Sequence, residues 1–388
     1  KGNIYSAKDS YSAVPDRLRD KVTNSDTLDK AIKRFAAIDT IKQAGTKSKD
    51  HFSTVLGTLA DNDIYPVQSI GGEWSVIALA RAGKLSADKA AKYYSELCEA
   101  VKANGSDRLS DRKPTENARV IIAMSSLGKN SADIAGYNLL SGLDDMDYIT
   151  SQGINAVIFS LIAFDTTDYS AKTHDELIAY IVDNMTGKGW ALAGDTADVD
   201  LTAMAIQALA PYAADEKVNA AIDSGLEFLA ESLDENARYA NGSESTSQVL
   251  IALAALGIDP LTDSRFIVDG ITVIDSLESS ATEHGYSHTL GGDENYMATE
   301  QAALALTAYE LSKDGTSLYE MSAKAEPTEP ENPDTPAQPG DSVKPGDCSG
   351  KPEDKNDPIN PGTGVLVTGG MAVLISGAVM LISKKKRK

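Results

Sequence analysis

Six short runs along the chain are apolar on nearly every side and rich in alanine. They recur at intervals of roughly 37 to 53 residues, at 73–82, 116–127, 154–164, 198–210, 245–256 and 298–311. Glycine or proline follows most of them directly, as at Gly83, Gly128 and Pro211, which is typical of a helix end. A helix without a polar face is typical of a protein interior, so each run predicts a buried helix.

A segment of a different kind precedes each apolar run. In 216–233, the apolar residues Val218, Ile222 and Leu226 share one helical face, and charged residues such as Asp223 lie opposite. The same spacing predicts amphipathic helices, each with one wet face. They are expected at 26–41, 86–103, 173–185 and 264–280, and most weakly at 132–140, with an extra helix or loop at 50–60.

Six pairs, each of one amphipathic helix and one fully apolar helix, can bury all their apolar surface in one simple arrangement. The apolar helices form an inner ring, and the amphipathic helices form an outer ring that faces water. An open stack would leave apolar ends exposed, whereas a closed ring covers them. The sequence therefore predicts an all-α protein whose residues 26–322 form an (α/α)6 toroid of twelve helices. The alternative is an open solenoid.

The starts of two predicted inner helices carry more specific residues. The run Gly187-Lys188-Gly189-Trp190 leads through Gly194 into the helix at 198–210, and a second turn, 284–288, leads through Gly291-Gly292 into the helix at 298–311. A glycine-aromatic turn followed by a polar loop and an Ala-rich helix resembles the terpenoid cyclase and protein prenyltransferase α/α-toroid superfamily. The resemblance covers roughly residues 26–321 and implies the fold more strongly than it implies an activity.

The activities of that superfamily differ in how well they fit this chain. Triterpene cyclases use an Asp-x-Asp-Asp-Thr motif, whereas this chain has Asp198-x-Asp200-Leu201-Thr202 and few aromatic residues. Prenyltransferases require a zinc-binding cysteine, and complement-type thioester domains require a cysteine before the Glu-Gln pair at 300–301; neither cysteine is present at such a place. The single-toroid cobalamin carriers of the transcobalamin type fit the size best. This resemblance implies a cobamide as one expected ligand, although the small β-domain that closes over it is not in these 388 residues.

Polar residues and tryptophans at the starts of the inner helices form the candidate ligand site, at one mouth of the ring. An Asp or Glu at a helix start most often caps backbone N–H groups, and a Trp there is most often a wedge between repeats, so each also has a structural reading. Carboxylates dominate this mouth, which favours a cationic or hydroxyl-rich ligand over an anionic one. The candidates are Trp74, Glu116, Trp190, Asp198, Asp200, Gln248, Tyr286 and Glu300.

Net charge restricts the partners. The chain carries a formal charge of −21, and because its last five residues are all cationic, the rest is more acidic still. Such a surface repels DNA, RNA and anionic lipid, which argues against nucleic-acid binding. The two cysteines, Cys98 and Cys348, lie in very different surroundings, so a disulfide between them is not expected. No metal ligand set is predicted: His284 and His288 are suitably spaced, but no third ligand is fixed.

The C-terminal region changes character at residue 323. Residues 323–359 are rich in Pro, Glu and Asp and almost free of apolar residues, which predicts a disordered, fairly stiff stalk. Residues 365–382 are uncharged and, as a helix, would span about 27 Å, enough to cross a bilayer. Five cations at 384–388 would hold that end in the cytoplasm.

The five residues before this apolar span complete a pattern. Asn360-Pro361-Gly362-Thr363-Gly364, the span and the basic tail together resemble the cell-wall sorting signal of Gram-positive surface proteins, which a sortase cleaves between Thr and Gly. The commonest family motif begins with Leu rather than Asn360, which points to a variant sortase class. The resemblance implies sortase and peptidoglycan as partners and the cell surface as the location. A simple membrane anchor is the alternative.

Together these patterns predict a stalked, wall-anchored toroid protein that binds a small molecule, with a cobamide as one candidate, or a glycan or surface component. Alternatives are a glycan-active or cyclase-like enzyme using Asp198 or Asp200 as acid or base, and a structural adhesin. Catalysis is the less favoured reading, and no cofactor is predicted. Residues 1–25 are expected to be a leader or linker. Because they carry no export signal, we expect the chain to be a fragment lacking N-terminal residues.

Overall fold

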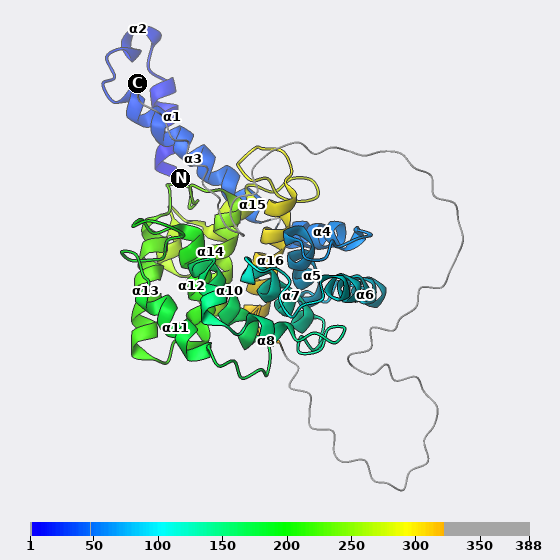
Figure 1. Ribbon diagram of the computed structural model, residues 1–388. Helices are drawn as coiled ribbons and strands as arrows, with labels where there is room; N and C mark the ends of the chain where they lie inside the picture. The colour runs from blue at the N-terminus through cyan, green and yellow to red at the C-terminus, as the bar shows by residue number, and fades with distance from the viewer. Residues whose placement is uncertain (1, 47, 322–388) are drawn as a thin grey trace, which may run out of the picture. The chain divides into compact units, whose positions relative to one another are not determined.

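A computed structural model describes residues 2–46 and 48–321. Within that part of the chain the protein is mostly helical, and its strands are confined to one two-residue pair and isolated bridges. The prediction of an all-α protein is therefore confirmed (Figure 1). None of the helices in the described ranges is both long enough and apolar enough to span a membrane. The predicted stalk at 323–359 and the sorting signal at 360–388 lie outside the described residues.

All six apolar runs form helices, as predicted. Their interiors are almost completely excluded from solvent; in the third helix, for example, every residue from 154 to 164 is buried. The helices are α5 (Ile70–Arg81), α7 (Pro114–Ser126), α10 (Ile154–Asp165), α12 (Val199–Leu209), α14 (Ser243–Ala255) and α16 (Tyr296–Ser312).

Most of the predicted amphipathic helices are also present. They are α3 (Ser25–Gly45), α6 (Ala87–Asn104), α11 (His174–Asp183) and α13 (Glu216–Glu231), and the extra segment near residue 50 is α4 (Ser48–Asp61). Local chemistry sets their ends. Ser86 caps α6 by accepting the Lys89 N–H, and Gly105 ends that helix with a φ of 70°. Asp215 caps α13 in the same way through its side chain.

The predicted helix at 264–280 is wrong for its first half. Instead, the 3-10 helix η2 (Ser264–Phe266) leads into a hairpin of β1 (Ile267–Val268) and β2 (Ile271–Thr272), and only then does α15 (Val273–Glu278) begin. The reason is local: Asp269 and Gly270 have φ of 52° and 77°, as an Asp-Gly hairpin turn requires. Thr272 and Asp275 then form a capping box that starts α15.

The weak helix expected at 132–140 is wrong for a similar reason. Ala135 and Gly136 both have positive φ, and the turn they form is closed by a bridge between Ile134 and Tyr137. Two short helices follow, α8 (Leu139–Leu143) and α9 (Met146–Thr150). A 3-10 turn, η1 (Ala210–Tyr212), extends α12.

The region expected to be a leader or linker, 1–25, contains α1 (Gly2–Ser12) and α2 (Asp16–Arg19). Tyr5 of α1 packs edge-on against Phe35 of α3, with ring centroids 5.8 Å apart. Cys98, buried on α6, is disulfide-bonded, so the expectation of no disulfide is wrong. Helical periodicity describes one segment at a time, and it holds no information on pairing between distant segments.

The chain divides into two compact units. The second unit spans residues 62–201 and also includes residues 319–321. Within it α5 packs on α7, α7 packs on α10, and α10 packs on α11, so that successive apolar helices are neighbours (Figure 1).

The first unit joins residues up to 61 with residues 202–318. Here α14 packs closely on α16, α4 packs on α16, and α3 packs on α15 and β2. Ile41 of α3 forms a small buried apolar cluster with Ala237 and Ile271. Beside it, Arg34 of α3 donates hydrogen bonds to Asp269 at 2.9 Å and Asn236 at 2.6 Å, which fasten α3 to residues more than 200 positions later.

Candidate functional site

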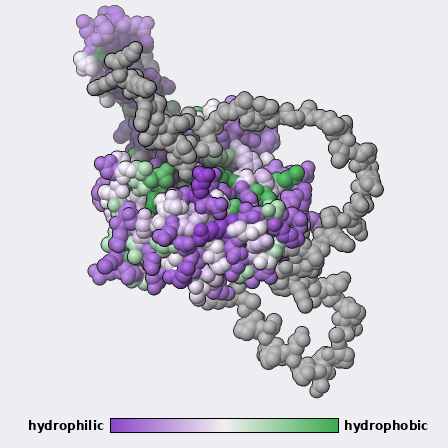
Figure 2. Space-filling view, viewed as in Figure 1, coloured by the Kyte–Doolittle hydropathy of each residue, from purple (hydrophilic) through white to green (hydrophobic). Residues whose placement is uncertain are grey.

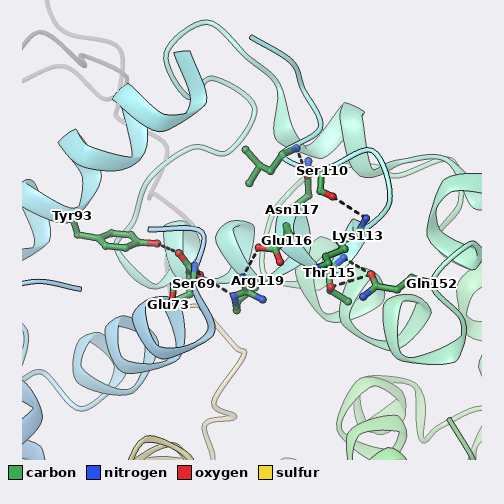
Figure 3. A network of polar contacts seen from close by, with 11 residues as sticks. Ser69, Glu73, Tyr93, Ser110, Lys113, Thr115, Glu116, Asn117, Arg119 and Gln152 are labelled. Carbon is green, nitrogen blue, oxygen red and sulfur yellow. Dashed lines mark hydrogen bonds and ion pairs between the residues drawn. The ribbon is translucent and has the colours of Figure 1, made fainter. Parts of the chain in front are cut away.

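A buried ion network lies where α5 and α7 begin, in the second unit (Figure 3). The Glu73 carboxylate accepts the Ser69 N–H at 2.8 Å, the Tyr93 O–H at 2.7 Å and the Arg119 Nε–H at 2.8 Å. Arg119 also donates from Nη2 to Glu116 at 2.6 Å. Glu73 and Arg119 are fully buried, whereas the Glu116 side chain is 16% exposed. Two carboxylates therefore share one guanidinium.

The backbone itself brings Glu73 into this position. Gly72, just before it, lies so close to Pro66 that a Cβ there would stand 1.7 Å from the Pro66 carbonyl oxygen. Only glycine permits this approach. The tight contact fixes the first turn of α5, and with it the direction in which Glu73 points.

The charges in this network depend on each other. Burial raises the pKa of Glu73, against the lowering effect of Arg119. Burial lowers the pKa of Arg119, but the carboxylates of Glu73 and Glu116 outweigh it, so the pKa is raised overall. Burial, followed by the Glu73 charge, raises the pKa of Tyr93 well above its usual value. Arg119 is thus firmly charged, and it neutralises acids that burial alone would disfavour.

The polar residues next to Glu116 have structural partners as well. The Asn117 side chain accepts the Leu109 N–H at 2.8 Å and donates to the carbonyls of Asp107 and Leu139 at 2.7 and 3.0 Å. Thr115 donates to Gln152 at 3.0 Å (Figure 3). These contacts hold the loop before α7 against the start of α8. Glu116, predicted to bind a ligand, therefore lies within a network that shapes the fold.

The two tryptophans predicted for the site are both buried. Trp74 packs against Phe159 of α10 with ring centroids 5.5 Å apart, and its indole N–H has no hydrogen-bond acceptor among the described residues. Trp190 donates from its indole to the Ile181 carbonyl at 2.6 Å and pairs through its backbone with Asp198. Trp190 therefore fastens the end of α11 to the start of α12, the two helices of one predicted pair.

The two aspartates before α12 differ in exposure. Asp198 is half-buried and accepts the Leu201 N–H at 3.0 Å, which is the capping role of an aspartate at a helix start. Asp200 is buried within the helix, with 4% of its surface exposed.

Three glutamines form a chain of hydrogen bonds in the first unit. Gln207 of α12 donates from Nε2 to both the backbone carbonyl and the side-chain oxygen of Gln248, at 3.0 and 2.9 Å. Gln248 of α14 in turn donates to the side-chain oxygen of Gln301 on α16. Of these, only Gln248 was a predicted site residue. Glu300, beside Gln301, is buried, and it does not cap α16, because Asn295 does so.

Tyr286, another predicted site residue, lies in a cluster that the sequence pattern did not reveal. Its hydroxyl lies 2.7 Å from Glu278 of α15 and 3.2 Å from Nδ1 of His51 on α4. The other nitrogen of His51 lies 3.1 Å from the Thr282 carbonyl. His51 is some 230 residues from its partners in sequence, so no local signal could have found the cluster. It ties α4 to α15 and to the following turn.

The two histidines of that turn do not converge on a metal. His288 contacts Glu244 at 2.7 Å, while His284 is exposed beside Glu283. Across residues 2–46 and 48–321, no group of three or more His, Cys, Asp or Glu side chains is arranged to hold a metal ion.

We expect buried tyrosines to make the protein sensitive to alkali. Burial raises the pKa of Tyr148 to about 12, and burial with the Glu278 charge raises the pKa of Tyr286 well above its usual value. In the unfolded chain both tyrosines ionise near pH 10. Between pH 10 and their pKa values in the folded protein, the unfolded state therefore binds fewer protons than the folded state. The free energy of unfolding should be unaffected by these groups below pH 10 and fall above it, by up to about 1.4 kcal/mol per pH unit per tyrosine.

Urea titrations at pH 9, 10 and 11, with absorbance at 295 nm to follow tyrosinate, measure this effect. The free energy of unfolding of Tyr286→Phe should fall less steeply with pH than that of the unmodified chain. Equal slopes for the two proteins would show that Tyr286 does not contribute.

Comparison with known proteins found no matching family model, no matching curated protein and no matching solved structure.

Proposed function

We propose that this chain is a wall-anchored α/α-toroid protein of a Gram-positive bacterium that binds an uncharged, oxygen-rich ligand, either a small molecule such as a cobamide or a glycan. The sorting-signal pattern at 360–388 supports the anchoring. The strongly acidic composition and the mostly hydrophilic face seen in Figure 2 suit an exported, solvent-exposed domain.

The helix arrangement supports the toroid. Six buried, Ala-rich helices alternate along the chain with more polar segments. Among them, α5 packs on α7 and α7 on α10 in the second unit, and α14 packs on α16 in the first. This is the neighbour relation that a ring of inner helices requires.

One observation favours binding over catalysis. Three acidic side chains at the inner-helix starts have structural roles: Glu73 and Glu116 share Arg119, and Asp198 caps α12. A glycosidase needs two carboxyl groups that face the substrate, one of them free to exchange a proton. Among the buried polar atoms without a hydrogen-bond partner in the described chain are two neutral donors, the Trp74 indole N–H and the Gln301 amide N–H groups. Neutral donors favour a ligand with uncharged oxygen acceptors.

Calorimetric titration of the full chain in mild detergent tests the binding proposal. The probes are chitopentaose, an oligomer of N-acetylglucosamine, and cyanocobalamin. We expect one of them to bind without being turned over. Hydrolysis of chitopentaose that disappears in Asp200→Asn would instead support the enzyme reading, and no heat from either probe would contradict the binding proposal.

Cell fractionation tests the anchoring proposal. In a Gram-positive host that carries the cognate sortase, Thr363→Ala should move the protein from the muramidase-released wall fraction to the membrane fraction. Ser383→Ala, which changes a residue outside the five-residue motif, is the matched control and should stay in the wall. Unchanged wall release of Thr363→Ala would show that this motif is not a sorting site.

A further inference from the structure

The direction of the glutamine chain is fixed at one end. Gln207 Nε2 approaches the backbone carbonyl of Gln248, which can only accept a hydrogen bond. The side-chain amide of Gln207 is therefore oriented with its N–H groups toward Gln248. The Gln248 atom that meets the same N–H groups must then be its oxygen, which turns the Gln248 N–H groups toward Gln301.

The last amide of the chain consequently presents donors. Gln301 accepts from Gln248 with its oxygen, and its own Nε2 has no acceptor in the described chain although the residue is fully buried. A buried N–H group without an acceptor destabilises the folded state, because the group has lost its hydrogen bond to water. Ser245, three residues before Gln248 and so on the same face of α14, is also fully buried with a hydroxyl that has no partner there.

We propose that Gln301 is a specificity-determining residue that donates its amide N–H groups to a carbonyl oxygen of the ligand, and that Gln207 and Gln248 are positioning residues that set its orientation. The inference rests on the proposed binding function and deepens it. Every group in the chain is an uncharged amide, so an uncharged acceptor suits it better than a carboxylate or a cation. An amide carbonyl is a strong neutral acceptor, and both the acetamido groups of a glycan and the side chains of a cobamide carry one.

The test compares ligands that differ in this group. Chitopentaose carries acetamide carbonyls, whereas its deacetylated counterpart, the glucosamine pentamer, carries ammonium groups that can only donate. Titrations of the full chain are run in 0.5 M salt, so that attraction of the cationic oligomer to the acidic protein is screened. Cyanocobalamin is the second carbonyl-bearing probe, and it distinguishes a cobamide from a glycan as the source of the carbonyl.

We expect Gln301→Met to weaken binding of the carbonyl-bearing probe about tenfold. Gln43→Met, at an exposed glutamine of α3, is the matched control and should bind as the unmodified chain does. Gln207→Met removes the group that sets the direction, so Gln301 can present either its nitrogen or its oxygen. It should reduce the preference for acetylated over deacetylated oligomer while binding persists, which a merely structural role would not do.

The outcomes separate the two proposals. If the unmodified chain binds a probe and a folded Gln301→Met binds it equally well, the donor role of Gln301 is wrong while the binding function stands; Gln301 would then serve a buried water. Equal affinity for both oligomers would also overturn it. If the unmodified chain binds neither carbonyl-bearing probe, the binding function itself fails, and this inference with it. Should Gln301→Met not fold, Gln301→Glu keeps the acceptor for Gln248 and removes the donors.

Discussion

Arg119→Met is expected to lower the free energy of unfolding by about 3–5 kcal/mol, the usual cost of leaving a buried charge without its partner. Arg119 and Glu73 are both buried, and Arg119 holds Glu116 as well. Methionine fills much of the same volume, so the loss reports charge rather than packing. Urea denaturation followed by circular dichroism measures it.

Two further variants make this result interpretable. Arg112 is an exposed arginine just before α7, and Arg112→Met should change stability by less than about 0.5 kcal/mol. Adding Glu73→Gln to Arg119→Met removes the stranded carboxylate and should restore part of the loss. The network does not hold the starts of α5 and α7 together if Arg119→Met lowers the free energy of unfolding as little as Arg112→Met does. The same conclusion follows if the loss in the double variant equals the sum of the losses in Arg119→Met and Glu73→Gln.

Gly72→Ala is expected to cost about 3 kcal/mol or more, because its new methyl group would lie 1.7 Å from the Pro66 carbonyl oxygen. The backbone of both segments has to move, and Glu73 moves with it. Gly57, on an exposed face of α4 with nothing within 4 Å of an added Cβ, is the matched control. Gly57→Ala should stabilise the protein by about 0.5–1 kcal/mol, since alanine is the better helix former.

The two substitutions are chemically identical and are predicted to have opposite signs. Thermal unfolding of both variants beside the unmodified chain is enough to check them. A neutral or stabilising Gly72→Ala would mean that Pro66 and the first turn of α5 are not in close contact.

Periodicity along the chain predicted the helices well and failed at hairpins. The six apolar runs and most amphipathic segments are helical because burial on one face or on all faces leaves a repeating pattern in sequence. At 267–272 the spacing of Ile267, Ile271 and Ile274 suits a helix, but the Asp269-Gly270 turn overrides it. That dipeptide is a known hairpin signal, so this correction was available from the sequence.

The site residues were harder to predict, because their partners are distant. The sequence identified polar residues at the starts of the apolar helices, but it did not identify the partners that decide their chemistry. Arg119 reads as one charge within an apolar run, and Gln207 as one polar residue near a helix end. Hydrogen bonds such as Gln248 to Gln301, or Tyr286 to His51, join elements that only the folded chain brings together. The spacing of residues within one helix cannot predict such hydrogen bonds.

The way the chain divides also has a consequence for how it folds. The second unit has α5, α7 and α10 in one continuous stretch, so these helices can pack on one another as soon as that stretch has emerged. The other unit has to wait, because Arg34 and Ile41 of α3 find their partners at 236–271. During synthesis α3 therefore stays without these long-range partners while about 200 residues pass, and loop closure of that length makes its docking the slow step.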